Sequence, residues 1–77
     1  MKLSGYAETE LPPDEIIPAS LAEVTLGAYS EELRAIAEFL THCAAEMDRM
    51  GAGYDHIHLS DRLRQFRDSP HFVVCRG

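Results

Sequence analysis

Apolar and polar residues follow two different periods along this 77-residue chain. Residues 2–8, 20–28 and 54–60 alternate between apolar and polar side chains, as half-buried strands do. Residues 31–50 instead repeat apolar side chains every three or four positions, which is typical of an amphipathic helix. Residues 72–75 (Phe-Val-Val-Cys) are rich in β-branched side chains and favour a last strand. The predicted order is strand, strand, helix, strand, strand.

The helix is the most clearly marked of these elements. Ser30 stands where an N-cap belongs, and Glu31 and Glu32 follow in the first turn, where the helix dipole favours negative charge. Gly51 and Gly53 supply the stop signal. The apolar stripe that we expect to face the core consists of Leu33, Ile36, Ala37, Leu40, Cys43, Ala44, Met47 and Met50. Such a helix is about 30 Å long, enough to cover a small sheet.

Two connections complete the expected fold. Residues 11–18 contain three prolines and read as an extended loop. Residues 62–67 form a basic connection, in which Leu63 and Phe66 are spaced as on one helical turn. Because one apolar helix stripe needs one apolar sheet face, we predict a single two-layer α+β domain over residues 1–77. Its long helix would pack on an antiparallel sheet of three or four strands.

Charge and cysteine content narrow the functional class. The formal charge is −6, and residues 1–50 carry ten acids against three bases. This surface disfavours nucleic acid and suits a basic partner, or it simply aids solubility. Cys43 and Cys75 are expected to be buried and unpaired in a cytoplasmic protein, and no apolar run is long enough for a membrane span. Because a core of this size is marginal, a homodimer is a further possibility.

The segment Tyr-Asp-His-Ile-His-Leu-Ser-Asp, residues 54–61, concentrates the chemistry of the chain. With Ile57 and Leu59 facing the core, His56 and His58 would project from the open sheet face, about 6.6 to 6.8 Å apart along the strand. Such a His-x-His strand can supply two ligands of a zinc-like site. The third ligand would come from His71, Glu23 or a second copy, and no cofactor is favoured. A small metal-binding domain is therefore the alternative function.

Two other interpretations compete with the metal site. A histidine oriented by Asp55 or Asp61 could act as a general acid or base, but neither Ser60 nor Cys75 lies in a recognisable nucleophile motif. We therefore expect a protein that is not an enzyme. The favoured interpretation is a hydrogen-bonding network or binding surface, in which Asp55 begins the strand and Asp61 caps the following turn.

The same segment resembles the immunity protein 32 family. The resemblance rests on Ala45-Glu46-Met47 at the helix end, a Gly-containing turn, the Asp-His-x-His-Leu-x-Asp core of residues 55–61, and Asp68-Ser69-Pro70 followed by Val73-Val74. The family consists of small proteins encoded beside bacterial polymorphic toxins. The resemblance implies a cytoplasmic immunity protein, an antitoxin that neutralises a cognate toxin by direct contact.

The toxin-binding surface is predicted from charge and strand geometry. Glu23 faces solvent from the second predicted strand, and Glu38 and Glu46 lie on the outer face of the helix. Glu23, His56 and His58 together form the candidate contact surface. If these side chains only hydrogen-bond to one another across strands, their role is structural.

Overall fold

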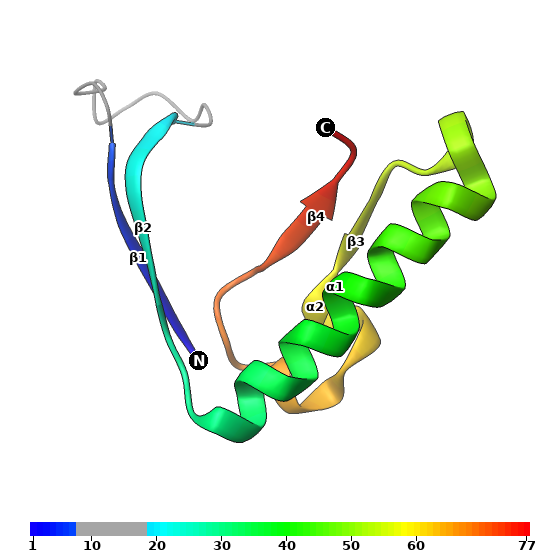
Figure 1. Ribbon diagram of the computed structural model, residues 1–77. Coiled ribbons are helices and arrows are strands. Elements are labelled where there is room, and N and C mark those ends of the chain that lie inside the picture. Colours follow the sequence, from blue (N-terminus) through cyan, green and yellow to red (C-terminus); the bar gives the residue numbers. More distant parts are fainter. Residues whose placement is uncertain (8–18) are drawn as a thin grey trace.

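The computed structural model describes residues 1–7 and 19–77, so the predicted loop over 11–18 lies outside the described residues. The elements are β1 (Lys2–Ala7), β2 (Leu21–Gly27), α1 (Ser30–Met50), η1 (Gly51–Gly53), β3 (His56–His58), α2 (Leu59–Arg62), η2 (Arg64–Phe66) and β4 (Val73–Cys75). The α+β class and the single long helix are confirmed. The strands, however, form two antiparallel pairs, β1–β2 and β3–β4, in place of the single sheet that the pattern predicts (Figure 1).

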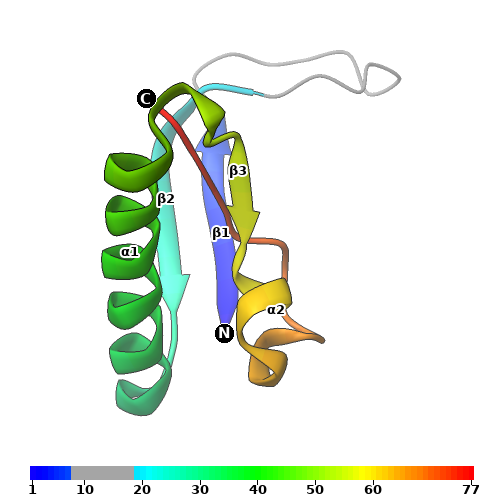
Figure 2. The same ribbon diagram turned by 90° about the vertical axis from the view of Figure 1, so that its right-hand side faces the viewer.

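The third strand is shorter than its alternating pattern suggests. β3 covers only His56–His58, and the chain turns into α2 at Leu59 instead of continuing to residue 60 (Figure 2). β3 and β4 therefore pair over three residues, with Ile57 opposite Val74. The β1–β2 hairpin stands apart from β4 on one side of the molecule (Figure 1). The layer that faces α1 is thus a narrow ribbon rather than a broad sheet.

The core lies between α1, β3 and the two short turns that follow β3. Its buried apolar residues are Ile36, Phe39, Cys43, Tyr54, Leu59 and Phe66. Phe39, which the predicted stripe omits, is only 2% exposed, whereas Leu33 and Leu40 of that stripe are 46% and 44% exposed. The predicted helix face is therefore wrong by part of a turn. The physical reason is that α1 packs against α2 and against the segment leading into β4, where Phe39 meets Phe72 edge to face with ring centroids 6.5 Å apart.

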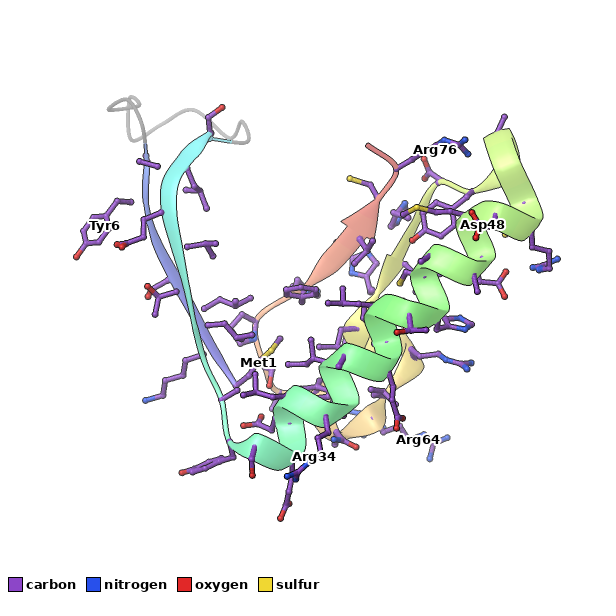
Figure 3. The ribbon with its side chains drawn as sticks, viewed as in Figure 1. Met1, Tyr6, Arg34, Asp48, Arg64 and Arg76 are labelled. Atoms are coloured by element: carbon purple, nitrogen blue, oxygen red, sulfur yellow. The ribbon has the colours of Figure 1, made fainter. Side chains whose placement is uncertain are left out.

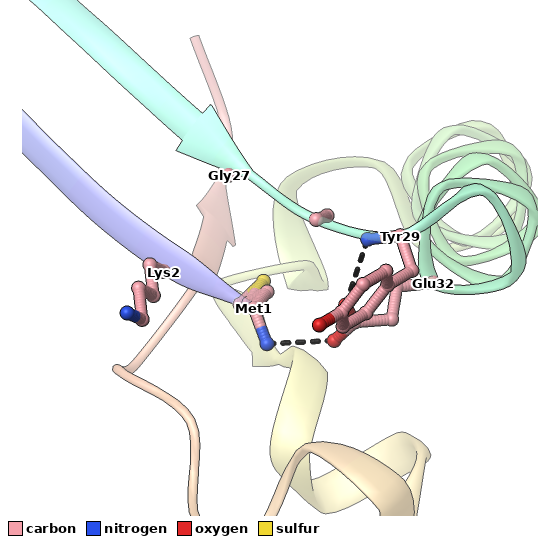
Figure 4. A pocket seen from close by; sticks show the side chains of 6 residues that line it. Met1, Lys2, Gly27, Tyr29 and Glu32 are labelled. Atoms are coloured by element: carbon pink, nitrogen blue, oxygen red, sulfur yellow. Dashed lines mark hydrogen bonds and ion pairs between the residues drawn. The ribbon is translucent and has the colours of Figure 1, made fainter.

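The helix begins one residue earlier than the sequence pattern suggests. Tyr29, not Ser30, is the N-cap, and its N–H donates to Glu32 Oε1 at 2.9 Å. The other carboxylate oxygen of Glu32 accepts a hydrogen bond from the Met1 ammonium group at 2.6 Å (Figure 4). The ammonium group and the Tyr29 N–H lower the pKa of Glu32. At the other end, Gly51 has φ of 55° and its N–H bonds to the Met47 carbonyl, which confirms the predicted stop.

The β1–β2 hairpin has one apolar and one polar face. Leu3 pairs with Leu26 and Gly5 with Val24, so these four residues share a face, while Lys2, Ser4, Tyr6, Glu23 and Thr25 belong to the other. Tyr6 points away from the rest of the molecule and is 71% exposed (Figure 3). Val24, on the apolar face, is also 64% exposed. The hairpin therefore presents apolar surface that the described part of the chain leaves uncovered.

Candidate functional site

The motif of residues 54–61 is held in place by three inward-pointing apolar side chains. Tyr54 and Leu59 are buried, at 5% and 0% exposed, and Ile57 packs against the core. The Tyr54 hydroxyl donates to the Val74 carbonyl at 2.8 Å and so ties β4 to the start of the motif. The prediction that Ile57 and Leu59 face the core is confirmed. The intervening polar residues are consequently directed outward.

His56, His58 and His71 form a continuous row on the outer side of the β3–β4 ribbon, and we call these three residues the histidine row. The rings of His56 and His58 are 5.1 Å apart between centroids, at an interplanar angle of 70°. His71, just before β4, lies 5.6 Å from His58 at 84°. The predicted juxtaposition of His56 and His58 is confirmed. The sequence pattern identifies His71 only as a possible third metal ligand. In the structure, His58 pairs with Val73, and His71 precedes Val73 by two residues, which places the His71 ring next to that of His58.

Asp55 extends the histidine row at one end. Its Oδ2 lies 2.6 Å from Nδ1 of His56, and the side chain of His56 is 47% exposed. This contact orients the exposed imidazole of His56. The row therefore combines imidazole rings in edge-to-face contact with one oriented acid–imidazole pair.

The geometry gives the metal-site interpretation no support. Within residues 1–7 and 19–77, no group of three histidine, cysteine, aspartate or glutamate side chains is placed to hold a metal ion. The rings of the histidine row meet edge to face, which is a packing contact. The two histidines of the His-x-His strand are thus side by side without a third ligand among the described residues.

Glu23 lies in a different sheet from the histidines. It is exposed on β2 opposite Tyr6, whereas His56 and His58 pair with β4. No hydrogen bond joins Glu23 to either histidine in the described part of the chain. The structure therefore brings His56, His58, His71 and Asp55 together and leaves Glu23 on the hairpin.

The two acids predicted on the outer helix face differ in their surroundings. Glu46 accepts hydrogen bonds from Arg49, with Nε at 3.0 Å, and this guanidinium lowers the pKa of Glu46. Glu38 is exposed and has no ion pair among the described residues. Of the two carboxylates, Glu38 is therefore the more exposed and has no ion pair among the described residues.

The remaining predicted residues have structural outcomes of their own. Asp61 is exposed within α2, and no side-chain cap hydrogen bond is present in either short turn, α2 or η2. Cys43 is buried as predicted, but Cys75 is exposed, because β4 turns that side chain away from the core. Both thiols are free. No helix of the described residues has the length and apolarity that crossing a membrane requires.

The comparison with protein families identifies the class. The family described as Immunity protein 32 matches residues 23–77, well over half of the chain and including the whole histidine row. The chain belongs to the immunity protein 32 family, as the resemblance of its motif predicts. β1 lies outside the matched residues. Comparisons with curated proteins and with solved structures found no match.

Proposed function

We propose that the protein neutralises a cognate bacterial toxin by direct protein–protein contact in the cytoplasm, without catalysis. The observation that carries this proposal is its membership of the immunity protein 32 family over residues 23–77. Immunity proteins of polymorphic toxin systems act as specific inhibitors, and specific inhibition needs a rigid, complementary surface rather than a reactive group. No cofactor has a part in this proposal.

The charge of the chain favours a basic toxin. The net charge is −6, and Glu23 and Glu38 are exposed acids without ion pairs among the described residues. A negative surface accelerates association with a positively charged partner, such as a domain that binds phosphates. On this basis, the association rate should fall steeply as salt is added.

The histidine row supports a second part of the proposed contact surface. His56 is held by Asp55 and is about half exposed, so its ring is oriented before a partner arrives. An oriented aromatic side chain loses little conformational entropy on binding, which favours affinity. The proposed contact residues are His56 and His58 on this ribbon, with Glu23 contributing charge from the hairpin.

The test is single replacement of Glu23, His56 and His58 by alanine, followed by toxin-protection assays in cells and thermal melts of the purified variants. We expect the His56→Ala and His58→Ala variants to lose protection while their melting temperatures stay near that of the parent chain. Glu23→Ala should mainly slow association, because an exposed charge acts over distance.

Matched controls separate binding from folding. His42→Ala removes a half-buried histidine from α1, and Thr25→Ala changes an exposed residue two positions from Glu23 on the same hairpin face. Neither should alter protection. Full protection by all three test variants would reject this surface, and failure of the unaltered chain to protect against the toxin encoded beside it would reject the proposed function.

A further inference from the structure

In the described part of the chain, an apolar groove lies between the β1–β2 hairpin and the chain leading into β4. It has a volume of about 370 Å³ and lies between the hairpin and β4 in Figure 3. Its lining residues are Leu3, Ser4, Gly5, Leu21, Val24, His71, Phe72 and Val73. Leu21, Val24 and Val73 are 51%, 64% and 41% exposed, although leucine and valine are commonly core residues. Exposed apolar side chains gathered along one groove are typical of surfaces that contact another chain or segment.

A contact with another chain would also stabilise the hairpin itself. A two-stranded hairpin is at best marginally stable in water, and gains independent stability when its apolar face packs against another element. In the described residues, β1 and β2 pair only with each other, so the hairpin has no third strand beside it. The six buried apolar residues of the core all lie outside the hairpin. Within residues 1–7 and 19–77, the apolar face of the hairpin therefore remains partly uncovered.

The charge of the groove selects the kind of occupant. No lysine, arginine, aspartate or glutamate lines it, although the chain as a whole carries a net charge of −6. A two-fold dimer places the same patch of both copies against itself, so a charged patch would repel its own image. A neutral apolar patch meets this condition. A toxin attracted by the acids would instead be drawn to the charged surfaces elsewhere.

We propose that the groove is the interface of a homodimer, in which the apolar hairpin face of each copy packs against the Phe72–Val73 segment of the other. Each copy supplies both surfaces of this contact, which makes the interface self-complementary. The histidine row begins at His71 on the edge of the groove, while His56 lies at its far end. Because His71 and Val73 line the groove and His58 pairs with Val73, the proposed contact lies beside this end of the histidine row.

The test is sedimentation velocity over a wide range of chain concentrations, combined with circular dichroism. The unaltered chain should sediment with twice its mass of 8.6 kDa. Val24→Asp places an unpaired charge in each half of the apolar contact, so the dissociation constant should rise by at least about 100-fold. A monomeric unaltered chain at all concentrations would overturn the proposal.

A matched control lies next to Val24 on the same strand. Thr25 is exposed on the polar face of β2, so Thr25→Asp adds the same charge one residue away and should leave the dimer intact. If Val24→Asp fails to fold, Val24→Thr keeps the shape and the strand preference, and should still weaken the dimer by about 10-fold. Equal dissociation of the Val24 and Thr25 variants would overturn the proposed face. A monomer whose toxin binding is lost in Val24→Asp would assign the groove to the toxin instead.

Discussion

Replacing Phe39 by alanine should remove a large share of the free energy of unfolding, although the predicted helix stripe leaves Phe39 out. Phe39 is 2% exposed and meets the ring of Phe72. Truncating a buried phenylalanine costs about 3–5 kcal/mol, from lost transfer free energy and the cavity left behind. A 77-residue domain has a total stability of about 4–12 kcal/mol. The loss is therefore a large share of the free energy of unfolding.

The neighbouring Leu40 is the matched control for this prediction. Leu40 is 44% exposed, so a little over half of its side chain is buried. Full burial of a leucine contributes roughly 1.5–3 kcal/mol to stability, and truncation at this position can remove only the corresponding part of that free energy. Leu40→Ala should cost at most about 1.5 kcal/mol, because water fills the space and alanine favours a helix.

Urea unfolding followed by circular dichroism, at one fixed chain concentration, measures both losses. The ratio between the two variants is the informative quantity. Equal losses for Phe39→Ala and Leu40→Ala would refute the rotated helix face and restore the face that the stripe predicts.

Two further predictions concern the hairpin and the alkaline limit of stability. A Cβ atom at Gly5 would lie 2.5 Å from the Glu23 carbonyl oxygen, so Gly5→Ala should force β1 and β2 apart. The backbone amides of β1 should then exchange hydrogen faster. Unchanged exchange would contradict this close approach. Burial raises the pKa of the Tyr54 hydroxyl above its usual value of about 10. The folded state therefore favours the neutral hydroxyl, and this contribution to stability is fully present below pH about 10. It is lost as the pH rises through the folded-state pKa. Tyr54→Phe should therefore show a flatter alkaline stability profile than the unaltered chain, and equally steep profiles would count against this cause.

The sequence alone determined the elements whose signals are local. Helical periodicity and Gly51 define α1 to within one residue, because spacing and a positive φ are properties of neighbouring residues. Alternation likewise directs Ile57 and Leu59 inward and His56 and His58 outward. The motif of residues 54–61, together with the segments on either side of it, also indicated the immunity protein 32 family, which the match over residues 23–77 then established.

Only the tertiary structure decided which of two adjacent helix faces is buried. Phe39 and Leu40 both fit a helical stripe, and the choice between them depends on where Phe66 and Phe72 pack, far away in the sequence. Strand pairing is non-local in the same way. An alternating pattern predicts a strand but does not show which other strand pairs with it. The sequence therefore could not reveal that β1–β2 and β3–β4 form separate pairs. The separation of Glu23 from the histidine row follows from that pairing, because a period of two fixes a face within one strand but not the distance between two sheets.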